Sequence, residues 1–207
     1  MALNLKYSAS LKNLQMDGLT TRLGASALID IMGGPQPANP DTTIVLTTLN
    51  GTIVAGATTV VVTSATGLPG AGNYTLWIDS EQMTVTAGQG TTSLTVTRGV
   101  NGTTAAGHTT GTNVTNTPIL ATLTCNATFA PASSGGVITL NAITSGTGST
   151  FAGPGSTAAW FRLKTSGATP HIDGTVGTAG CDLNLNNTSI ATGQSVAISS
   201  FVVTNGN

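Results

Sequence analysis

Apolar and polar side chains alternate along the last third of the chain, residues 157–207. Within 158–164, positions 159, 161 and 163 are apolar, and Trp160, Arg162 and Lys164 occupy the positions between them. A period of two predicts a β-strand with one dry and one solvated face. Trp160 and Arg162 are thus interpreted either as residues of a partly exposed face or as contacts with another subunit, because aromatic residues and Arg are enriched in interface cores.

Three more strands are predicted after this one. The run 171–176 forms an antiparallel partner, joined to 158–164 by a short loop. In 181–185 the leucines at 183 and 185 face inward. In 195–204 the apolar positions change parity near Ser199 and Ser200, which predicts a β-bulge or kink there.

The N-terminal part contains one good helix candidate, residues 8–23. Ser8 or Ser10 is a suitable N-cap, Gly24 suits the C-terminal end, and Gly18 weakens the interior. Leucines recur at helical spacing at positions 11, 14, 19 and 23, which predicts a helix packed on one face or edge of a sheet. A short strand is predicted at 27–32, followed by turn and linker residues at 33–41.

From residue 42 the texture changes to short strands rich in Thr and Val, separated by Gly, Pro and Asn turns. Strands of the kind predicted before residue 42 resume at Ile119. We therefore predict an insert, residues 42–116, placed in a surface loop of a parent segment, residues 1–41 and 117–207. The predicted fold class is mainly β: a β-sandwich parent domain with one N-terminal helix, plus a small inserted all-β domain.

Charge is unusually sparse in this sequence. Charged residues make up 6% of the chain, with a formal net charge of −1, against about 25% in an ordinary soluble domain. Two explanations are compatible with each other: partners cover much of the surface, and abundant Thr, Ser and Asn keep it hydrated without charge. Six dispersed cations form no basic patch, so nucleic acid is not an expected partner. No membrane partner is expected either, because no apolar run approaches transmembrane length, and the start does not match a signal peptide.

No constellation predicts catalysis, a cofactor or a metal. The glycines at 148 and 153 have P-loop spacing but lack the following Lys. Asp79 and Glu81 are two residues apart, as paired acids can be, but a polar turn is the favoured interpretation. His171 and Asp173 form a His-x-Asp pair without a visible third ligand. We therefore expect a protein that is not an enzyme.

The cysteines, Cys125 and Cys181, both fall in predicted strands. Buried free thiols are the favoured interpretation. A disulfide is the alternative, which their spacing in the sequence leaves open.

Several segments resemble tailed-bacteriophage virion structural proteins. Residues 28–38 and 119–123 match a family in which a G-x-Q-P-A-x-P-D loop leads soon into L-L-A-T-L, and 157–162, 182–186 and 204–207 match the same family. The present chain departs from that family by the extra module in the loop. The insert in turn resembles β modules of phage structural proteins through 78–81, 96–103 and His108. The resemblance implies that Arg98, Asn101 and His108 hold a turn.

The resemblance covers most of the chain and implies a location in the virion. The expected function is that of a capsid decoration or cement protein on the outer surface of the head. Its expected partners are the major capsid protein or other virion proteins, and further copies of itself in a homotrimer. The alternative is a tail, neck or fibre component whose insert binds host glycans through exposed aromatic residues, Tyr74 and Trp77.

Overall fold

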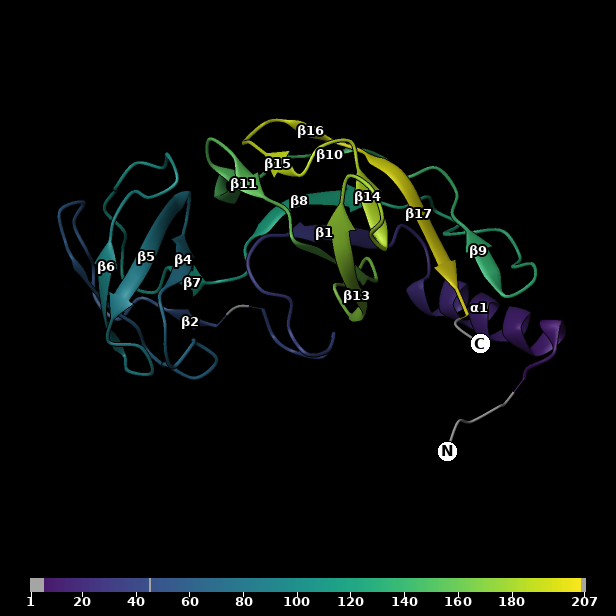
Figure 1. Ribbon diagram of the computed structural model, residues 1–207, viewed down its shortest axis with the longest axis horizontal. Helices are drawn as coiled ribbons and strands as arrows, with labels where there is room; N and C mark the ends of the chain where they lie inside the picture. Colours follow the sequence, from purple (N-terminus) through teal and green to yellow (C-terminus); the bar gives the residue numbers. More distant parts are fainter. Residues whose placement is uncertain (1–5, 45, 206–207) are drawn as a thin grey trace.

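The computed structural model describes residues 6–44 and 46–205 and, within these ranges, is mainly β with one α-helix (Figure 1), which confirms the predicted fold class. The parent segment contains α1 (Ala9–Leu23), β1 (Leu28–Met32), β8 (Ile119–Thr124), β9 (Val137–Thr139), β10 (Gly146–Thr147), the 3-10 helix η1 (Thr150–Ala152), β11 (Ser156–Thr157), β12 (Trp160–Lys164), β13 (Pro170–Gly177), β14 (Leu183–Leu185), β15 (Ser189–Ile190), β16 (Ser195–Val196) and β17 (Ile198–Thr204). The insert contains β2 (Thr47–Thr48), β3 (Thr59–Val61), β4 (Tyr74–Ile78), β5 (Glu81–Ala87), β6 (Ser93–Thr97) and β7 (Asn113–Thr115).

The parent segment is organised by a curled seven-stranded sheet in the order β8-β1-β12-β13-β14-β17-β9. All its pairs are antiparallel except β13 with β14. The predicted pairing of the strands around 158–164 and 171–176 is confirmed, with Phe161 opposite Gly174. Gly174 is required there, because an added Cβ would lie 2.5 Å from the Phe161 ring.

One hydrophobic cluster fills the parent segment and gives it a sandwich-like packing. Side chains of β1, β8 and β12 meet those of the short pairs β10–β16 and β11–β15 across this core. Phe161 packs edge-on against Phe201, with ring centroids 5.1 Å apart. Leu183 and Leu185 are fully buried, as predicted.

Helix α1 begins and ends where the sequence predicts. The Ser8 hydroxyl accepts a hydrogen bond from the Leu11 N–H at 3.2 Å, and Gly24 caps the other end with φ 68°. Only the C-terminal half supplies the core, through Leu19 and Leu23. Leu14 of the other half is 69% exposed, contrary to the expected packing of all four leucines.

Polar contacts through Asn13 and Asp17 hold the middle of α1. The Asn13 side-chain oxygen accepts from the Gly136 N–H at 2.8 Å, and Asp17 accepts from the Ser133 N–H at 2.8 Å. The helix therefore lies beside the loop that precedes β9, at the end of the sheet (Figure 1).

The last strand contains the predicted bulge. Opposite β14, Ser200 pairs with Asn184 and Ile198 pairs with Leu185, so Ser199 is left as an extra residue. An extra residue reverses the faces of everything beyond it. Val196 therefore reaches the core on one side of the break, and Phe201 reaches it on the other.

The insert forms its own six-stranded sheet in the order β2-β7-β4-β5-β6-β3, in which every pair is antiparallel. Its hydrophobic cluster includes Leu76, Ile78 and Met83 and shares no residue with the cluster of the parent segment. In Figure 1 the insert lies at one end of the long axis and α1 lies at the other.

Gln82 connects the insert to the parent segment. Its side-chain N–H donates to the Ser156 hydroxyl at 2.6 Å, and its oxygen accepts from the Asn101 side chain at 2.8 Å. The Ser156 hydroxyl in turn donates to the carbonyl of Ala152. The insert and the parent segment are thus joined by a partly buried chain of polar contacts as well as by the linkers.

Candidate functional site

A row of polar residues crosses four strands of the parent sheet. Thr122 on β8 lies opposite Asp30 on β1, Asp30 lies opposite Arg162 on β12, and Arg162 lies opposite Asp173 on β13. Residues directly opposite each other in an antiparallel sheet share a face, so the four side chains form one line. Lys164 belongs to the same face of β12, two residues beyond Arg162.

Arg162 is the centre of this row. Its Nε and Nη2 donate to the two carboxylate oxygens of Asp173 at 2.8 and 2.7 Å, and its Nη1 donates to the carbonyl of Thr42 at 2.9 Å. The guanidinium also lies over the Trp160 ring, 5.3 Å from its centroid. A bidentate pair of this kind fixes geometry more strongly than a single contact.

Asp30 has one partner on each neighbouring strand, Thr122 on β8 and Lys164 on β12. Its Oδ1 accepts from the Thr122 hydroxyl at 2.7 Å, and its Oδ2 lies 2.5 Å from Nζ of Lys164. The Asp30 side chain is 1% exposed and the Lys164 side chain 15%. The four charges of the row therefore form two internal pairs.

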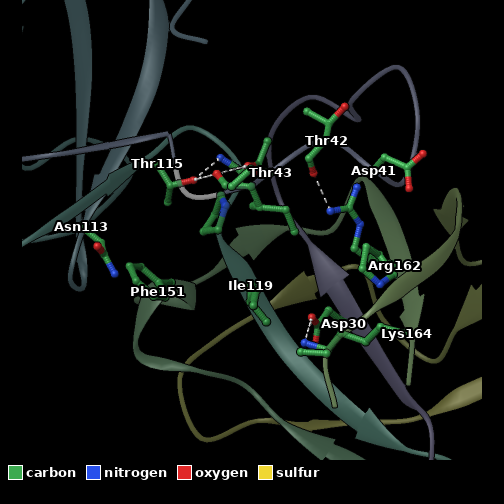
Figure 2. Close-up of a pocket in the computed structure, with 15 residues that line it drawn as sticks. Asp30, Asp41, Thr42, Thr43, Asn113, Thr115, Ile119, Phe151, Arg162 and Lys164 are labelled. Carbon is green, nitrogen blue, oxygen red and sulfur yellow. Dashed lines mark hydrogen bonds and ion pairs between the residues drawn. The ribbon is translucent and has the colours of Figure 1, made fainter. Parts of the chain in front are cut away.

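A cavity of about 510 Å³ opens above this row (Figure 2). Its floor is formed by Asp30, Arg162 and Lys164, and its walls by the two linkers that join the insert to the parent segment. Phe151 and Ile119 add apolar surface. The exposed Asp41 stands in the wall of the cavity.

The expectation that Trp160 and Arg162 lie on a solvated face is wrong. They are 1% and 3% exposed. The linker at residues 41–44 crosses this face of β12, and its Thr42 carbonyl binds Arg162, so both faces of the strand are covered. Because the chain itself buries both side chains, their surfaces are not free for another subunit to contact.

A second charged cluster lies inside the insert, around Glu81. Arg98 forms a bidentate pair with it, at 2.7 Å from Nε and 2.7 Å from Nη2. The N–H groups of Gly99 and Ala106 also donate to its oxygens, at 3.1 and 3.0 Å. Burial alone would raise the pKa of Glu81, but the bonds from Arg98, Ala106 and His108 lower it to about 2. Glu81 is therefore an ionised structural centre, not a proton donor near neutral pH.

His108 extends this cluster to Asp79. Its Nε2 lies 2.9 Å from Glu81 and its Nδ1 lies 2.8 Å from Asp79. The imidazole is buried, whereas the Asp79 side chain is 61% exposed. Both acids thus contact one histidine, which forms an isolated β-bridge with Ile53.

Arg98 also donates to three backbone carbonyls, those of Val54, Ala57 and Ala106, at 2.6 to 3.1 Å. Asn101 donates to Gln82. These contacts agree with the expectation that Arg98, Asn101 and His108 hold loops in place.

Neither of the two aromatic residues considered for glycan binding is fully exposed. Trp77 is 7% exposed and lies outside the core cluster of the insert, on the face of β4 opposite to Leu76. It lines a cavity of about 450 Å³ together with Gly34 and Ser156 of the parent segment. Tyr74 is half-buried, and burial raises the pKa of its hydroxyl. Trp77 therefore packs at the junction of the two sheets instead of presenting a free ring.

The remaining candidate residues are not gathered into a site. Cys125 and Cys181 are free thiols just outside their neighbouring strands, and burial raises the pKa of Cys125 to about 11. Asp173 is occupied by Arg162, so the pair His171 and Asp173 does not form a metal site. Within residues 6–44 and 46–205 there is no group of three or more His, Cys, Asp or Glu that could hold a metal ion.

Comparisons with known proteins add no relative. No family model, no curated protein and no solved structure matches the chain. The described part of the chain also contains no helix that is long and apolar enough to cross a bilayer. A function is therefore proposed from the charged row, the charged cluster around Glu81 and the surface of the molecule.

Proposed function

We propose that the protein is a non-enzymatic structural component of a tailed-bacteriophage virion, and more specifically a decoration protein that binds the outer surface of the head. The motif resemblance described above motivates the class. The observation that carries the proposal is the distribution of charge, because it determines which surface is suited to a partner.

Nearly half of the charged side chains pair with one another inside the molecule. Six of the thirteen charged residues form internal pairs: Asp30 with Lys164, Arg162 with Asp173, and Glu81 with Arg98. A freely diffusing protein usually keeps its charge on the surface for solubility. A surface dominated by neutral polar groups suits permanent association in an assembly, whose interface cores are depleted of charge.

The other three cations all belong to one region. Lys6, Lys12 and Arg22 lie on α1 or just before it, and none of them lies within the described strands. The same region carries exposed apolar side chains: Tyr7, Leu11 and Leu14 are 39, 41 and 69% exposed. Exposed apolar side chains and cations in one short stretch of the chain suit a negatively charged, partly apolar partner. This stretch, called the α1 face, is therefore the proposed surface for docking on the major capsid protein.

Mixing the purified protein with heads that lack it tests this proposal. The proposal expects saturable binding with a fixed number of copies per head, and a closed oligomer such as a trimer at the bound sites. Leu14→Asp should abolish binding. Val54→Asp is a matched control, since Val54 is also 69% exposed but lies in the insert. Equal loss of binding in both variants, or none in either, would exclude the α1 face.

The tail-fibre alternative finds less support. Glycan recognition by the insert needs an exposed aromatic ring, whereas Trp77 is buried against the parent segment. Glycan-array binding that disappears with Tyr74→Ala, with the fold intact, would restore that alternative.

A further inference from the structure

Lys164 and Asp30 form the closest charge pair on the floor of the large cavity (Figure 2). They lie on adjacent antiparallel strands, β12 and β1, and are offset by one diagonal step, because Leu28 is directly opposite Lys164. Nζ of Lys164 is 2.5 Å from Oδ2 of Asp30. The nitrogen is therefore next to the carboxyl carbon to which that oxygen is bonded.

The Lys164–Asp30 pair is distinct from the neighbouring Arg162–Asp173 pair. Arg162 is directly opposite Asp30 but turns to Asp173, so Lys164 is the cation that meets Asp30. The two cations differ chemically. An arginine stays protonated in proteins, whereas a lysine amine becomes a nucleophile when burial removes its charge.

The pair lies largely out of contact with water. The Asp30 and Lys164 side chains are 1% and 15% exposed. Condensation of the pair requires transfer of one proton from the ammonium to the carboxylate, and the two atoms are in direct contact for it. The products of that transfer, a free amine and a carboxylic acid, are the two partners needed for amide formation.

We propose that Lys164 and Asp30 condense into an intramolecular isopeptide bond in the folded protein. Nζ attacks the carboxyl carbon of Asp30, and a C–N bond forms. The C–Oδ2 bond breaks, and Oδ2 leaves as water with two of the three ammonium protons. Oδ1 remains as the carbonyl oxygen of the amide. The step is a dehydration without any change of oxidation state, so it needs no co-reactant.

Thr122 and the cavity provide the surroundings for this step. The Thr122 hydroxyl donates to Oδ1 at 2.7 Å, which fixes the carboxyl group and polarises the oxygen that becomes the amide carbonyl. Holding two reacting groups in contact gives effective concentrations on the order of 10⁵–10⁸ M in well-oriented systems. The cavity offers the released water a way out. The inference concerns the parent sheet alone and does not depend on the proposed role in a virion.

Intact-mass measurement of the purified, unfolded chain tests the bond. After allowance for loss of the initiator Met, the expected mass is lower than the sequence mass by one water molecule. A tryptic digest should contain residues 23–98 joined to residues 163–207, since trypsin does not cleave after an acylated Lys164. Lys164→Arg should show the full mass, because Arg keeps the positive charge but cannot condense.

Lys12→Arg is the matched control, since Lys12 lies on α1, outside the pair, and this variant should keep the mass loss. A full sequence mass in the unsubstituted protein would overturn the proposal, whatever the variants do. Persistence of the mass loss in Lys164→Arg would also overturn it, because the water would then have left from another site.

Discussion

Glu81 concentrates more hydrogen bonds than any other carboxylate described above. It accepts from Arg98 and from two backbone N–H groups and contacts His108, all within a few ångströms and away from water. Removing one member of a buried ion pair leaves the other charged and unpaired, which is why single substitutions in such pairs are strongly destabilising.

Glu81→Gln should therefore lower the free energy of unfolding of the insert by about 3–5 kcal/mol. The matched control is Asp79→Asn, which removes the other carboxylate in contact with His108. Its side chain is 61% exposed, so the expected loss is about 1 kcal/mol or less. Urea unfolding followed by Trp77 fluorescence in a Trp160→Phe background measures both. Equal losses of unfolding free energy in the two variants would show that the burial of a carboxylate does not determine its contribution to stability.

The lowered pKa of Glu81 predicts how stability depends on pH. The pKa is about 2 in the folded protein against an ordinary value of 4.5. The folded state therefore binds the proton less well than the unfolded state. The contribution of Glu81 is complete above pH 4.5 and is lost as the pH falls from 4.5 toward 2.

The measurement for this prediction is the urea midpoint of the protein and of Glu81→Gln at about pH 6 and at about pH 3. The difference between the two proteins should shrink at the lower pH. A difference that stays constant would mean that Glu81 titrates alike in both states.

Within the helices and strands, glycines differ in whether there is room for an added Cβ. Gly18 lies inside α1, and an added Cβ would have no heavy atom within 4 Å. Gly18→Ala should stabilise the protein by about 0.5–1 kcal/mol, because it reduces the freedom of the unfolded chain and suits the helix.

Gly148→Ala should have the opposite sign, since its Cβ would lie 2.0 Å from the carbonyl oxygen of Ala191. Thermal melting of the two variants side by side provides the check. Destabilisation by Gly18→Ala would mean that this helix face is covered in solution.

The elements themselves could be predicted where the sequence alone determines them. The ends of α1 follow from Ser8 and Gly24, and the bulge at Ser199 follows from the change of parity within one strand. The exposure of Trp160 and Trp77 could not be predicted, because it depends on segments distant in sequence. The guanidinium of Arg162, held by the carbonyl of Thr42, lies over Trp160, and Trp77 lines a cavity together with residues of the parent segment.

The candidate site was missed for a similar reason. Asp30, Arg162 and Asp173 are separated by many residues, and only the strand register places them in one row. Alternation indicated that Arg162 shares a face with Lys164, and the predicted hairpin placed the strand of Asp173 beside them. The sequence carried no information on the strand of Asp30, which lies on their other side. The one local signal was a charged residue, Asp30, inside an otherwise apolar strand.

At the scale of the whole molecule, the boundaries of the insert at residues 42 and 116 stay a prediction. Replacing 42–116 by a short Gly-Ser bridge should leave a folded parent segment, since its core cluster contains no insert residue. The variant should melt at a lower temperature than the full chain, because Arg162 loses the Thr42 carbonyl and Ser156 loses Gln82. Circular dichroism and a cooperative melt are the measurements; a molten parent segment would show that the two sheets form one folding unit.

The number of copies of this chain in purified virions separates a decoration role from the other placements. A decoration protein covers the joints of the head lattice, so we expect hundreds of copies per particle. Heads without the protein should lose resistance to heat or chelator. A dozen copies or fewer, absent from tail-less heads, would contradict the decoration role. Complete absence from the virion would contradict the structural role itself.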